Sequence, residues 1–333
     1  MTTRVSSGVD CLPDDPAVHA PAAPRQSRLA RTLRWINLLA VVVPFLGFAA
    51  AVVYSWGWGL DWPTVAIFVV MYIATGIGVT VGYHRLFTHR AFETTRPIRA
   101  VLGILGSMAV EGPILYWVAV HRRHHQHSDD DHDPHSPHHF GGGLRGTLMG
   151  LWHAHTGWLF REHTSGLSRY VGDLRKDNVA SRVSALFPVW VVLGLLLPTI
   201  AGGLIAMSWK GALLGFLWGG LARIFLVHHV TWSINSVCHL WGYQSFHGGD
   251  ESRNNVVFGV LGFGEGWHNN HHAFPRSARH GLRWWELDTS YLLIRGLECI
   301  GLAWNVKTPH PQMLAAKRDR ENARSTVEHD PVA

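Results

Sequence analysis

The chain has 333 residues, of which 47% are hydrophobic and only 16% are charged. An ordinary soluble protein carries about 25% charged residues, so this composition favours a membrane protein. The net charge of +6 comes with no nucleic-acid-binding motif, which favours basic cytoplasmic loops over nucleic-acid binding. The three cysteines are far apart and indicate neither a disulfide framework nor a thiolate metal site, whereas 24 histidines is an unusual number.

The apolar runs predict four membrane spans in one domain. Residues 1–30 are rich in Pro, Ala, Ser and Arg without periodicity, which predicts a disordered N-terminal tail. About 20 apolar residues at 36–56 are enough to cross a bilayer core of about 30 Å. Further runs predict spans at 63–83, 185–207 and 211–232. Residues 98–120 are less apolar and contain Glu111, Gly112 and Pro113, so we expect one interfacial or half-buried helix there. The charged stretch 311–333 predicts a C-terminal tail after a domain at 31–310.

Basic residues lie on one side of these spans. The first connection, 57–64, has no Lys or Arg. The basic residues that flank the first two spans on the other side are Arg25, Arg28, Arg31, Arg34, Arg85, Arg90, Arg122 and Arg123. By the positive-inside rule, both termini and the long middle loop are cytoplasmic. The sequence therefore predicts an all-α integral membrane protein with four transmembrane helices in two hairpins. A cytoplasmic helical cap, about 84–184 and 233–333, covers them.

Eight histidines form three boxes on the predicted cytoplasmic side. They are His84 and His89 in HRLFTH, His121, His124 and His125 in HRRHH, and His268, His271 and His272 in HNNHH. In H-x-x-H-H the histidines lie three and four residues apart, so each of these boxes presents three imidazoles in one direction on a helix. His84 and His89 are about 140° apart on an ideal helix. We therefore expect the second span to end near Tyr83 and to unwind between them.

The number of histidines favours two metal ions over one. Imidazole suits zinc, copper, iron and nickel. One zinc uses about four protein ligands at a structural site and about three at a catalytic site, so eight histidines exceed either. Carboxylate-bridged di-iron bundles carry a Glu-x-x-His motif on each of two helices. Because this chain has one copy, Glu265 to His268, the sequence predicts a di-metal centre held chiefly by nitrogen.

The order of the boxes between paired spans resembles the membrane fatty acid desaturases. The resemblance is strongest to the Δ9-type acyl-CoA and acyl-lipid (stearoyl-CoA desaturase-like) branch and covers about residues 65–310. The flanking words agree: GYHRLFTHRAF, DPHSP, HTGWLF, TWSINSVCHLWG and GEGWHNNHHAFP. The resemblance implies two iron ions, with O₂ as co-substrate, that insert a cis double bond into an acyl chain. It also implies two further iron ligands, Asn235 and His239, which are four residues apart and share a helix face.

The resemblance extends to partners and location. It implies an acyl-CoA or acyl-lipid substrate and a separate electron donor, such as ferredoxin, cytochrome b5 or a reductase, because no cytochrome b5 domain follows. Ala119 and Val120 stand where animal-type enzymes carry a charged pair, which favours the bacterial branch and a bacterial inner membrane. In these enzymes the acyl chain ends near the second span, here the region of Ile73, Thr75, Gly76 and Gly78.

Other polar residues are candidates for supporting roles. Asp129, Asp131, Asp133 and Glu265 are candidates to orient ligand imidazoles through the second ring N–H, and each is otherwise an ordinary loop acid. The histidines expected in a polar loop around the site are His132, His135, His138 and His139. Supporting or purely structural roles are expected for His153, His155, His228, His229 and His280.

Two other functions fit part of the pattern. A histidine-box hydroxylase or ketolase acting on a lipid or hydrocarbon would use the same metal site, but the DPH and NSxxH words favour desaturation. A histidine-rich membrane metal transporter would line its pathway with ionisable residues inside the spans. Spans one to three are nearly free of such residues, which argues against transport.

Overall fold

The computed structural model describes residues 28–57, 60–161, 166–247 and 249–317. The predicted tail at 1–30 lies outside these residues except for its last three, which begin the first helix. The predicted C-terminal tail is described only to residue 317.

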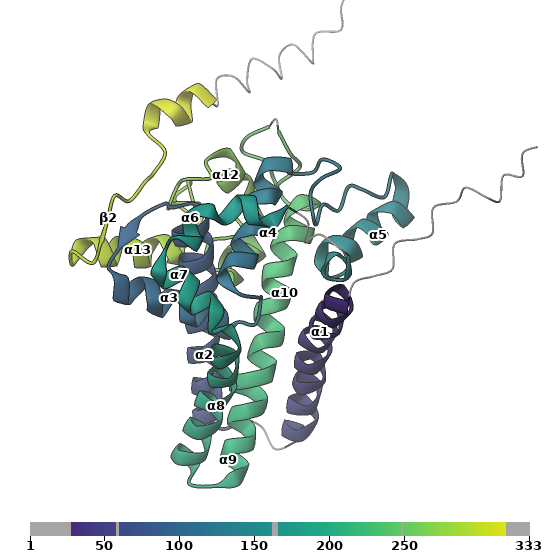
Figure 1. Cartoon of the computed structure of the whole chain (residues 1–333), viewed down its shortest axis with the longest axis vertical. Coiled ribbons are helices and arrows are strands. Elements are labelled where there is room, and N and C mark those ends of the chain that lie inside the picture. The colour runs from purple at the N-terminus through teal and green to yellow at the C-terminus, as the bar shows by residue number, and fades with distance from the viewer. Residues whose placement is uncertain (1–27, 58–59, 162–165, 248, 318–333) are drawn as a thin grey trace, which may run out of the picture.

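Four helical segments in the described chain are long and apolar enough to cross a membrane, which confirms the predicted all-α membrane fold. They stand side by side in the lower half of the molecule (Figure 1). The first is α1 (Arg28–Ser55), the second is α2 (Trp62–Ile77) continued by η1 (Gly78–Thr88), and the third is α8 (Phe187–Ala206). The fourth joins α9 (Trp209–Leu214), η4 (Gly215–Ala222), α10 (Arg223–Ser236) and η5 (Val237–His239).

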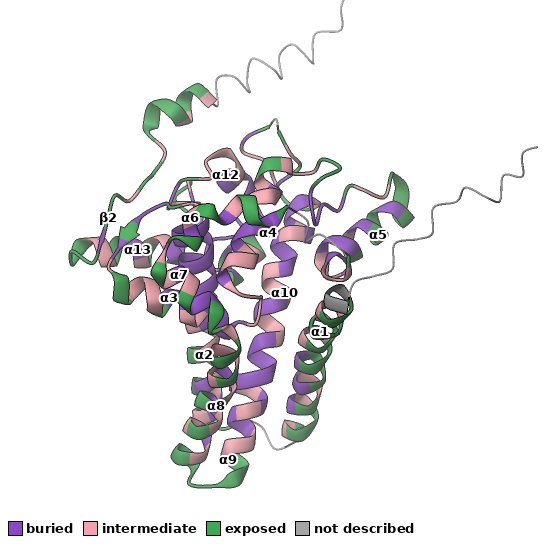
Figure 2. Ribbon diagram, viewed as in Figure 1, coloured by how far each residue is buried: buried purple, intermediate pink, exposed green. Residues whose placement is uncertain are grey.

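The fourth span is the central one. Its most apolar window is 67% buried, against 17% in α1 and in α8. Figure 2 shows the same difference, with buried residues along α10 and exposed residues on the outer faces of α1 and α8. N-capping side chains mark where the second and fourth spans begin. Asp61 accepts a hydrogen bond from Thr64 N (2.8 Å) at the start of α2, and Ser208 caps α9 in the same way. The central span is therefore positioned to bring side chains to the cap from the middle of the bundle.

The second span does not end near Tyr83, contrary to the prediction. It continues as the π-helix η1 through Thr88, and His89 N donates to His84 O at 3.1 Å. In a π-helix the backbone bonds join residues five apart, so residues five apart lie above one another. His84 and His89 thus share a face without any unwinding.

Residues 98–120 form two helices rather than the single one predicted. They are α3 (Arg96–Met108) and α4 (Ile114–His127), joined by a turn at 109–113. Gly112 has φ of +103° and Pro113 has no backbone N–H, so the helix cannot continue through this turn. α4 then rises into the cap with the second histidine box (Figure 1).

Short elements complete the cap. They are α5 (Gly143–His155), η2 (Gly157–Phe160), η3 (Leu167–Val171), α6 (Gly172–Arg175), α7 (Asn178–Ala185), α11 (Val256–Leu261), α12 (His268–Ala273) and α13 (Thr289–Cys299). The strands β1 (Glu93–Thr94) and β2 (Ala303–Trp304) pair antiparallel. The largest hydrophobic core lies beneath these elements and includes Tyr83, Phe87, Ile114 and Val118. This core fixes η1 and α4, the two helices that carry the first two histidine boxes.

Candidate metal centre

Nine histidines gather into two clusters under the cap. The first cluster is His84, His89, His121, His125 and His271, and the second cluster is His124, His239, His268 and His272. Within each cluster the ligand nitrogens lie within 4.8 Å of one another. The structure thus brings together all eight box histidines and His239, from η1 and the residue that follows it, and from α4, η5 and α12.

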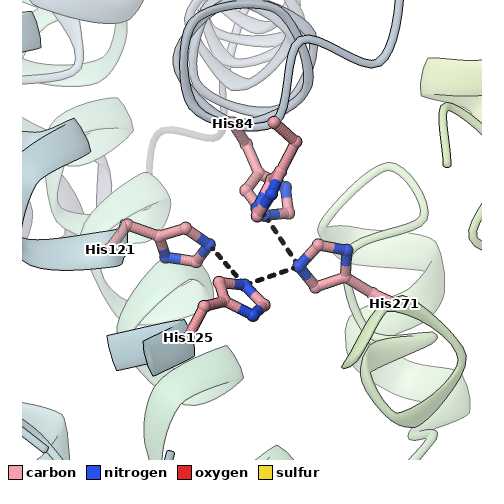
Figure 3. Close-up of side chains that lie close together, drawn as sticks. His84, His121, His125 and His271 are labelled. Atoms are coloured by element: carbon pink, nitrogen blue, oxygen red, sulfur yellow. Dashed lines mark hydrogen bonds between the residues drawn. The ribbon is translucent and has the colours of Figure 1, made fainter. Parts of the chain in front are cut away.

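Each H-x-x-H-H box is divided between the clusters instead of facing one way. The residues four apart stay together: His121 and His125 join the first cluster, while His268 and His272 join the second. The remaining member of each box crosses to the other cluster. Figure 3 shows His271 of α12 reaching His84 and His125, with Nε2–Nε2 distances of 3.1 and 2.9 Å. Both boxes therefore hold the two clusters side by side.

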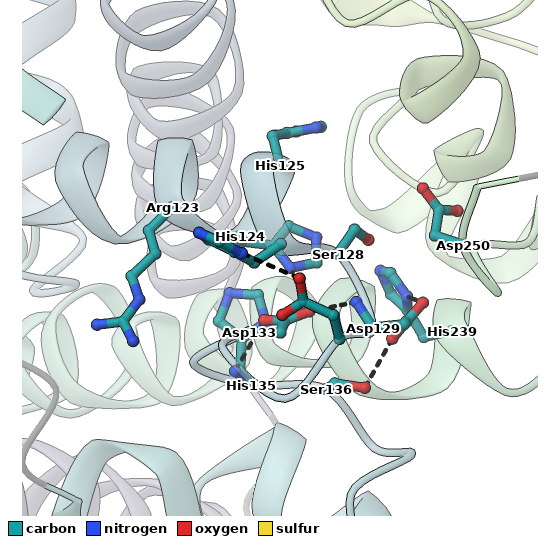
Figure 4. Close-up of polar contacts among 12 residues, drawn as sticks. Arg123, His124, His125, Ser128, Asp129, Asp133, His135, Ser136, His239 and Asp250 are labelled. Atoms are coloured by element: carbon teal, nitrogen blue, oxygen red, sulfur yellow. Dashed lines mark hydrogen bonds and ion pairs between the residues drawn. The ribbon is translucent and has the colours of Figure 1, made fainter.

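Four carboxylates, each buried or partly buried, contact the Nδ1 atoms of histidines in the two clusters. The Nδ1–oxygen distances are 2.5 Å for His84–Glu265, 2.9 Å for His124–Asp133, 2.9 Å for His239–Asp129 and 2.7 Å for His272–Asp250. Figure 4 shows the Asp129 and Asp133 pairs in the loop after α4. Each carboxylate accepts the Nδ1 proton, which fixes the tautomer and leaves an Nε2 lone pair directed into the cluster.

The set of acids that contact cluster histidines differs from the predicted set at two positions, Asp250 and Asp131. Asp250 was not predicted, because an acid 18 residues before the third box, next to Glu251, carries no spacing signal. Asp131 is exposed and makes no hydrogen bond or ion pair with a described residue, so it does not orient an imidazole as Asp129, Asp133 and Glu265 do. The difference arises because Asp131 lies at the outer side of the loop.

The donor set fits metal ions better than it fits a hydrogen-bonded network. In the second cluster, three of four imidazoles have Nδ1 committed to a carboxylate, so when all four are neutral only His268 has a proton to donate from Nε2. Yet the Nε2 atom of His268 lies 3.2 Å from Nε2 of His239 and 3.1 Å from Nε2 of His272. The Nε2 atoms of His272 and His124 are also only 3.4 Å apart. Facing lone pairs repel unless a cation lies between them. Two nitrogens bound to one metal at about 2.1 Å and at right angles are about 3 Å apart.

Charge supports the same conclusion. Burial lowers the pKa of His121, His125 and His271 well below its usual range, so these imidazoles are neutral and offer lone pairs. Burial raises the pKa of Asp250, but the neighbouring His272 outweighs it and holds the pKa below its usual range. Carboxylates behind neutral ligands in a buried site require compensating cations.

A buried ion network anchors the first cluster from behind. Arg85 is fully buried and donates from Nη1 to Asp288 Oδ1 (2.8 Å) and from Nε to Glu265 Oε1 (3.2 Å). His280 Nδ1 lies 3.1 Å from Arg85 Nη2 and 3.5 Å from Glu265 Oε2. Sequence reasoning placed His280 only among supporting residues and missed Arg85 and Asp288, because their partners are about 200 residues away in the chain. The network holds Glu265, and through it His84, in place.

Other sequence-predicted histidines surround the clusters. His135 is buried against His124, with ring centroids 4.4 Å apart, and His138 Nε2 lies 3.0 Å from His239 O. Asn235 lies one helical turn before His239 and lines a cavity together with His268. The loop and the end of the fourth span thus meet at the second cluster.

A cavity of about 440 Å³ opens beside both clusters. Its lining includes His84 and His121 of the first cluster and His268 of the second. Most of the other walls are apolar, and they include Val41, Val120, Trp158, Phe187 and Ile234. From the second span the cavity is lined by Val79 and Thr80, a little nearer the cap than the region expected from the resemblance.

Comparison with known proteins agrees with this geometry. The model of the fatty acid desaturase family matches residues 60–298. A hex-5-enoyl-[acyl-carrier protein] acetylenase of Moorena producens is 46% identical over 84% of this chain and 88% of its own length. An sn-1 stearoyl-lipid 9-desaturase of Anabaena variabilis is 38% identical over 83% of this chain and 94% of its own. An icosanoyl-CoA 5-desaturase of Limnanthes douglasii is 36% identical over 88% and 76%.

Proposed function

The chain belongs to the fatty acid desaturase family and is an oxidoreductase that acts on acyl chains, and from this premise we propose that it inserts a cis double bond, at C9, into a saturated acyl chain carried on CoA or lipid. The observation that carries the proposal is the cavity whose wall contains histidines of both clusters. A chain lying in it has neighbouring methylene groups next to both candidate metal positions.

We propose two iron ions as the cofactor. The first would be held by His84, His89, His121, His125 and His271, and the second by His124, His239, His268 and His272, with Asn235 beside them. Bound iron supplies O₂ activation and the oxidising power to remove hydrogen from unactivated methylene groups. Overall, O₂, two electrons and two protons are consumed and two waters leave as the chain loses two hydrogens.

The chain's own residues orient the ligands and exclude water. Asp129, Asp133, Asp250 and Glu265 hold the imidazoles through Nδ1, so the Nε2 lone pairs are fixed before any metal binds. Apolar side chains of α1, α4 and α10 bury the acyl chain, which aligns it and keeps water from the oxidising site. No side chain is needed as a general base.

Partners and orientation follow from the same proposal. Electrons come from a separate donor, which would be ferredoxin, cytochrome b5 or a reductase. We place the protein in a bacterial inner membrane with both termini and the metal centre cytoplasmic, because Arg31 and Arg34 at the cap end of α1 and Arg122 and Arg123 in the cap lie on one side of the spans.

One relative supports a second product. The acetylenase is 46% identical to this chain, and its name denotes an acyl chain that already has a double bond, carried on acyl-carrier protein. The same oxidation applied to an alkene would give an alkyne. This second candidate function would use the same metal centre as the first, but its substrate would be an acyl chain that already has a double bond.

The test is expression in a host that makes no unsaturated fatty acids, followed by mass spectrometry and double-bond mapping. The proposal expects monounsaturated chains that are two mass units lighter than their precursors. Products sixteen units heavier would instead establish a hydroxylase, and alkynes formed only from supplied alkenoates would establish an acetylenase. No change in any acyl chain, with the protein inserted in the membrane, would overturn the proposal.

A further inference from the structure

A carboxyl group lies on the wall of the acyl cavity and is not used by the proposed chemistry. Glu111 lines the cavity from the turn between α3 and α4. The residue is half-buried, and its Oε1 atom is buried without a hydrogen-bond partner of good geometry among the described residues. An acid in such a position is costly, so its presence needs an explanation.

The turn that carries Glu111 is held by two membrane spans. Arg223 Nη1 donates to Met108 O at 2.5 Å, and His228 Nε2 donates to Ala109 O at 2.9 Å, both from α10. Tyr83 of η1 donates its hydroxyl proton to Gly112 O at 3.1 Å. The carbonyls on either side of Glu111 are therefore fixed by groups from the membrane bundle, and the carboxyl cannot leave the cavity wall easily.

The backbone of this turn is strained beside the acid. Val110 has φ of +65°, a conformation that a β-branched residue adopts at a cost of about 1–3 kcal/mol. Such strain persists only where the surroundings over-determine the conformation, and here the Arg223, His228 and Tyr83 bonds do so. The bonds that hold this strained backbone also fix the turn that carries Glu111.

Glu111 connects the cavity wall to a ligand of the first cluster through Trp117. The indole Nε1 donates to Glu111 Oε2 at 2.9 Å, and the indole stacks on the His121 ring with centroids 4.9 Å apart and an interplanar angle of 18°. Thr231 of α10 also lies next to the carboxyl. Glu111 therefore joins α4 and α10 at the point where the cavity passes His121.

We infer that Glu111 is a positioning residue for the acyl chain: its carboxyl accepts from the Trp117 indole and so fixes the part of the cavity wall that the chain contacts beside His121. This inference rests on the proposed function, because it assumes that an acyl chain occupies the cavity. Glu111 does not act on the reacting carbons itself. It determines which methylene groups are held next to the histidine clusters.

The charge state of Glu111 follows from its surroundings. Burial raises the pKa of this carboxyl to about 7, and the neighbouring Thr231 hydroxyl and the Trp117 hydrogen bond oppose this rise. The titratable and charged groups nearest to it are Tyr83 of η1, Tyr116 of α4, and Arg223 and His228 of α10. The rest of the cavity wall carries Arg34, His84, His121, His135, Arg161, Glu265 and His268. Below about pH 7 the carboxyl is neutral and compatible with a bound apolar chain. Above it the carboxylate requires water, which competes with the chain for the cavity.

The experiment compares wild type, Glu111→Gln and Glu111→Ala as full chains in host membranes that contain isotope-labelled stearate. Desaturation rates are measured at low and high label content from about pH 6 to about pH 9, and double-bond positions are mapped. For wild type we expect the rate at low substrate to fall up to about tenfold per pH unit above pH 7, with the rate at high substrate nearly constant. Glu111→Gln keeps the hydrogen bond and abolishes this pH dependence. Glu111→Ala gives a mixture of double-bond positions.

Controls separate the possible failures. Glu298→Gln on α13, where the carboxylate pairs with Arg295, should leave both the pH profile and the product unchanged. Metal content should be equal in all variants that fold. If the Glu111→Ala chain fails to insert into the membrane, the pH profile of Glu111→Gln decides whether the inference holds. A wild type without product overturns the proposed function and this inference with it. An active wild type whose pH profile is shared by Glu111→Gln overturns the inference alone.

Discussion

His84 and His89 are five residues apart in sequence, and their Nε2 atoms are 3.1 Å apart in space. The π-helix η1 makes this possible, because its backbone bonds join residues five apart, as between His89 N and His84 O. An α-helix would point the two imidazoles in different directions. The first histidine cluster therefore depends on a rare backbone conformation, and π-helical turns occur frequently at functional sites.

His271→Ala should abolish desaturation and remove metal from the first cluster. His271 Nε2 lies 3.1 Å from that of His84 and 2.9 Å from that of His125, so its loss opens the middle of the cluster. We expect metal per chain, measured by mass spectrometry of the purified protein, to fall by about half. His310→Ala, at an exposed histidine, should retain both metal and activity. Full activity in His271→Ala would refute the ligand assignment.

Asp133→Asn should weaken metal binding without unfolding the cap. Asp133 accepts from His124 Nδ1 at 2.9 Å and also accepts from Asp129 N and His135 N. Loss of such a partner typically lowers metal affinity or activity about 10- to 100-fold. Competition with a chelator measures the change. Asp131→Asn, on the same loop but exposed, is the matched control, and an equal effect of both variants would contradict the assigned role.

Arg85→Met should destabilise the protein by about 3–5 kcal/mol, because it leaves Asp288 and Glu265 buried without their cation. The measurement is thermal unfolding of the detergent-solubilised protein. Arg295→Met removes a partly exposed pair with Glu298, and its cost should be about 0–1 kcal/mol. Similar melting temperatures for the two variants would show that the Arg85 network is not a buried anchor.

Gly78→Ala should disrupt the packing of the second span against α3. A Cβ atom at Gly78 would lie 2.1 Å from Gly106 N and 2.3 Å from Leu105 C, so backbone would have to move. We expect a loss of about 1–3 kcal/mol and lower yield of inserted protein. Gly296→Ala in α13 meets nothing within 4 Å and should instead stabilise its helix by about 0.5–1 kcal/mol. The comparison is made by thermal unfolding, and a tolerated Gly78→Ala would mean that the helices separate easily.

The exchange of His124 and His271 between clusters was not predictable from the boxes. Positions three and four residues apart share a helix face, which gave the expectation of three imidazoles in one direction. The two histidine clusters both draw on α4 and α12, and a small difference in direction around each helix decides which cluster an imidazole joins. That difference depends on how α4 and α12 are packed, which spacing within either segment does not specify.

The sequence by itself determined the approximate positions of the four candidate membrane spans and the histidines that form the two clusters, because apolar length and local spacing are properties of contiguous residues. It also identified Asp129, Asp133 and Glu265 as candidates to orient imidazoles. Only the tertiary structure decided that His84 and His89 share a π-helical face, that Asp250 faces His272, and that Arg85 lies between Glu265 and Asp288. These relationships join residues through packing and buried charge compensation, and such interactions depend on distance in space and not on separation along the chain.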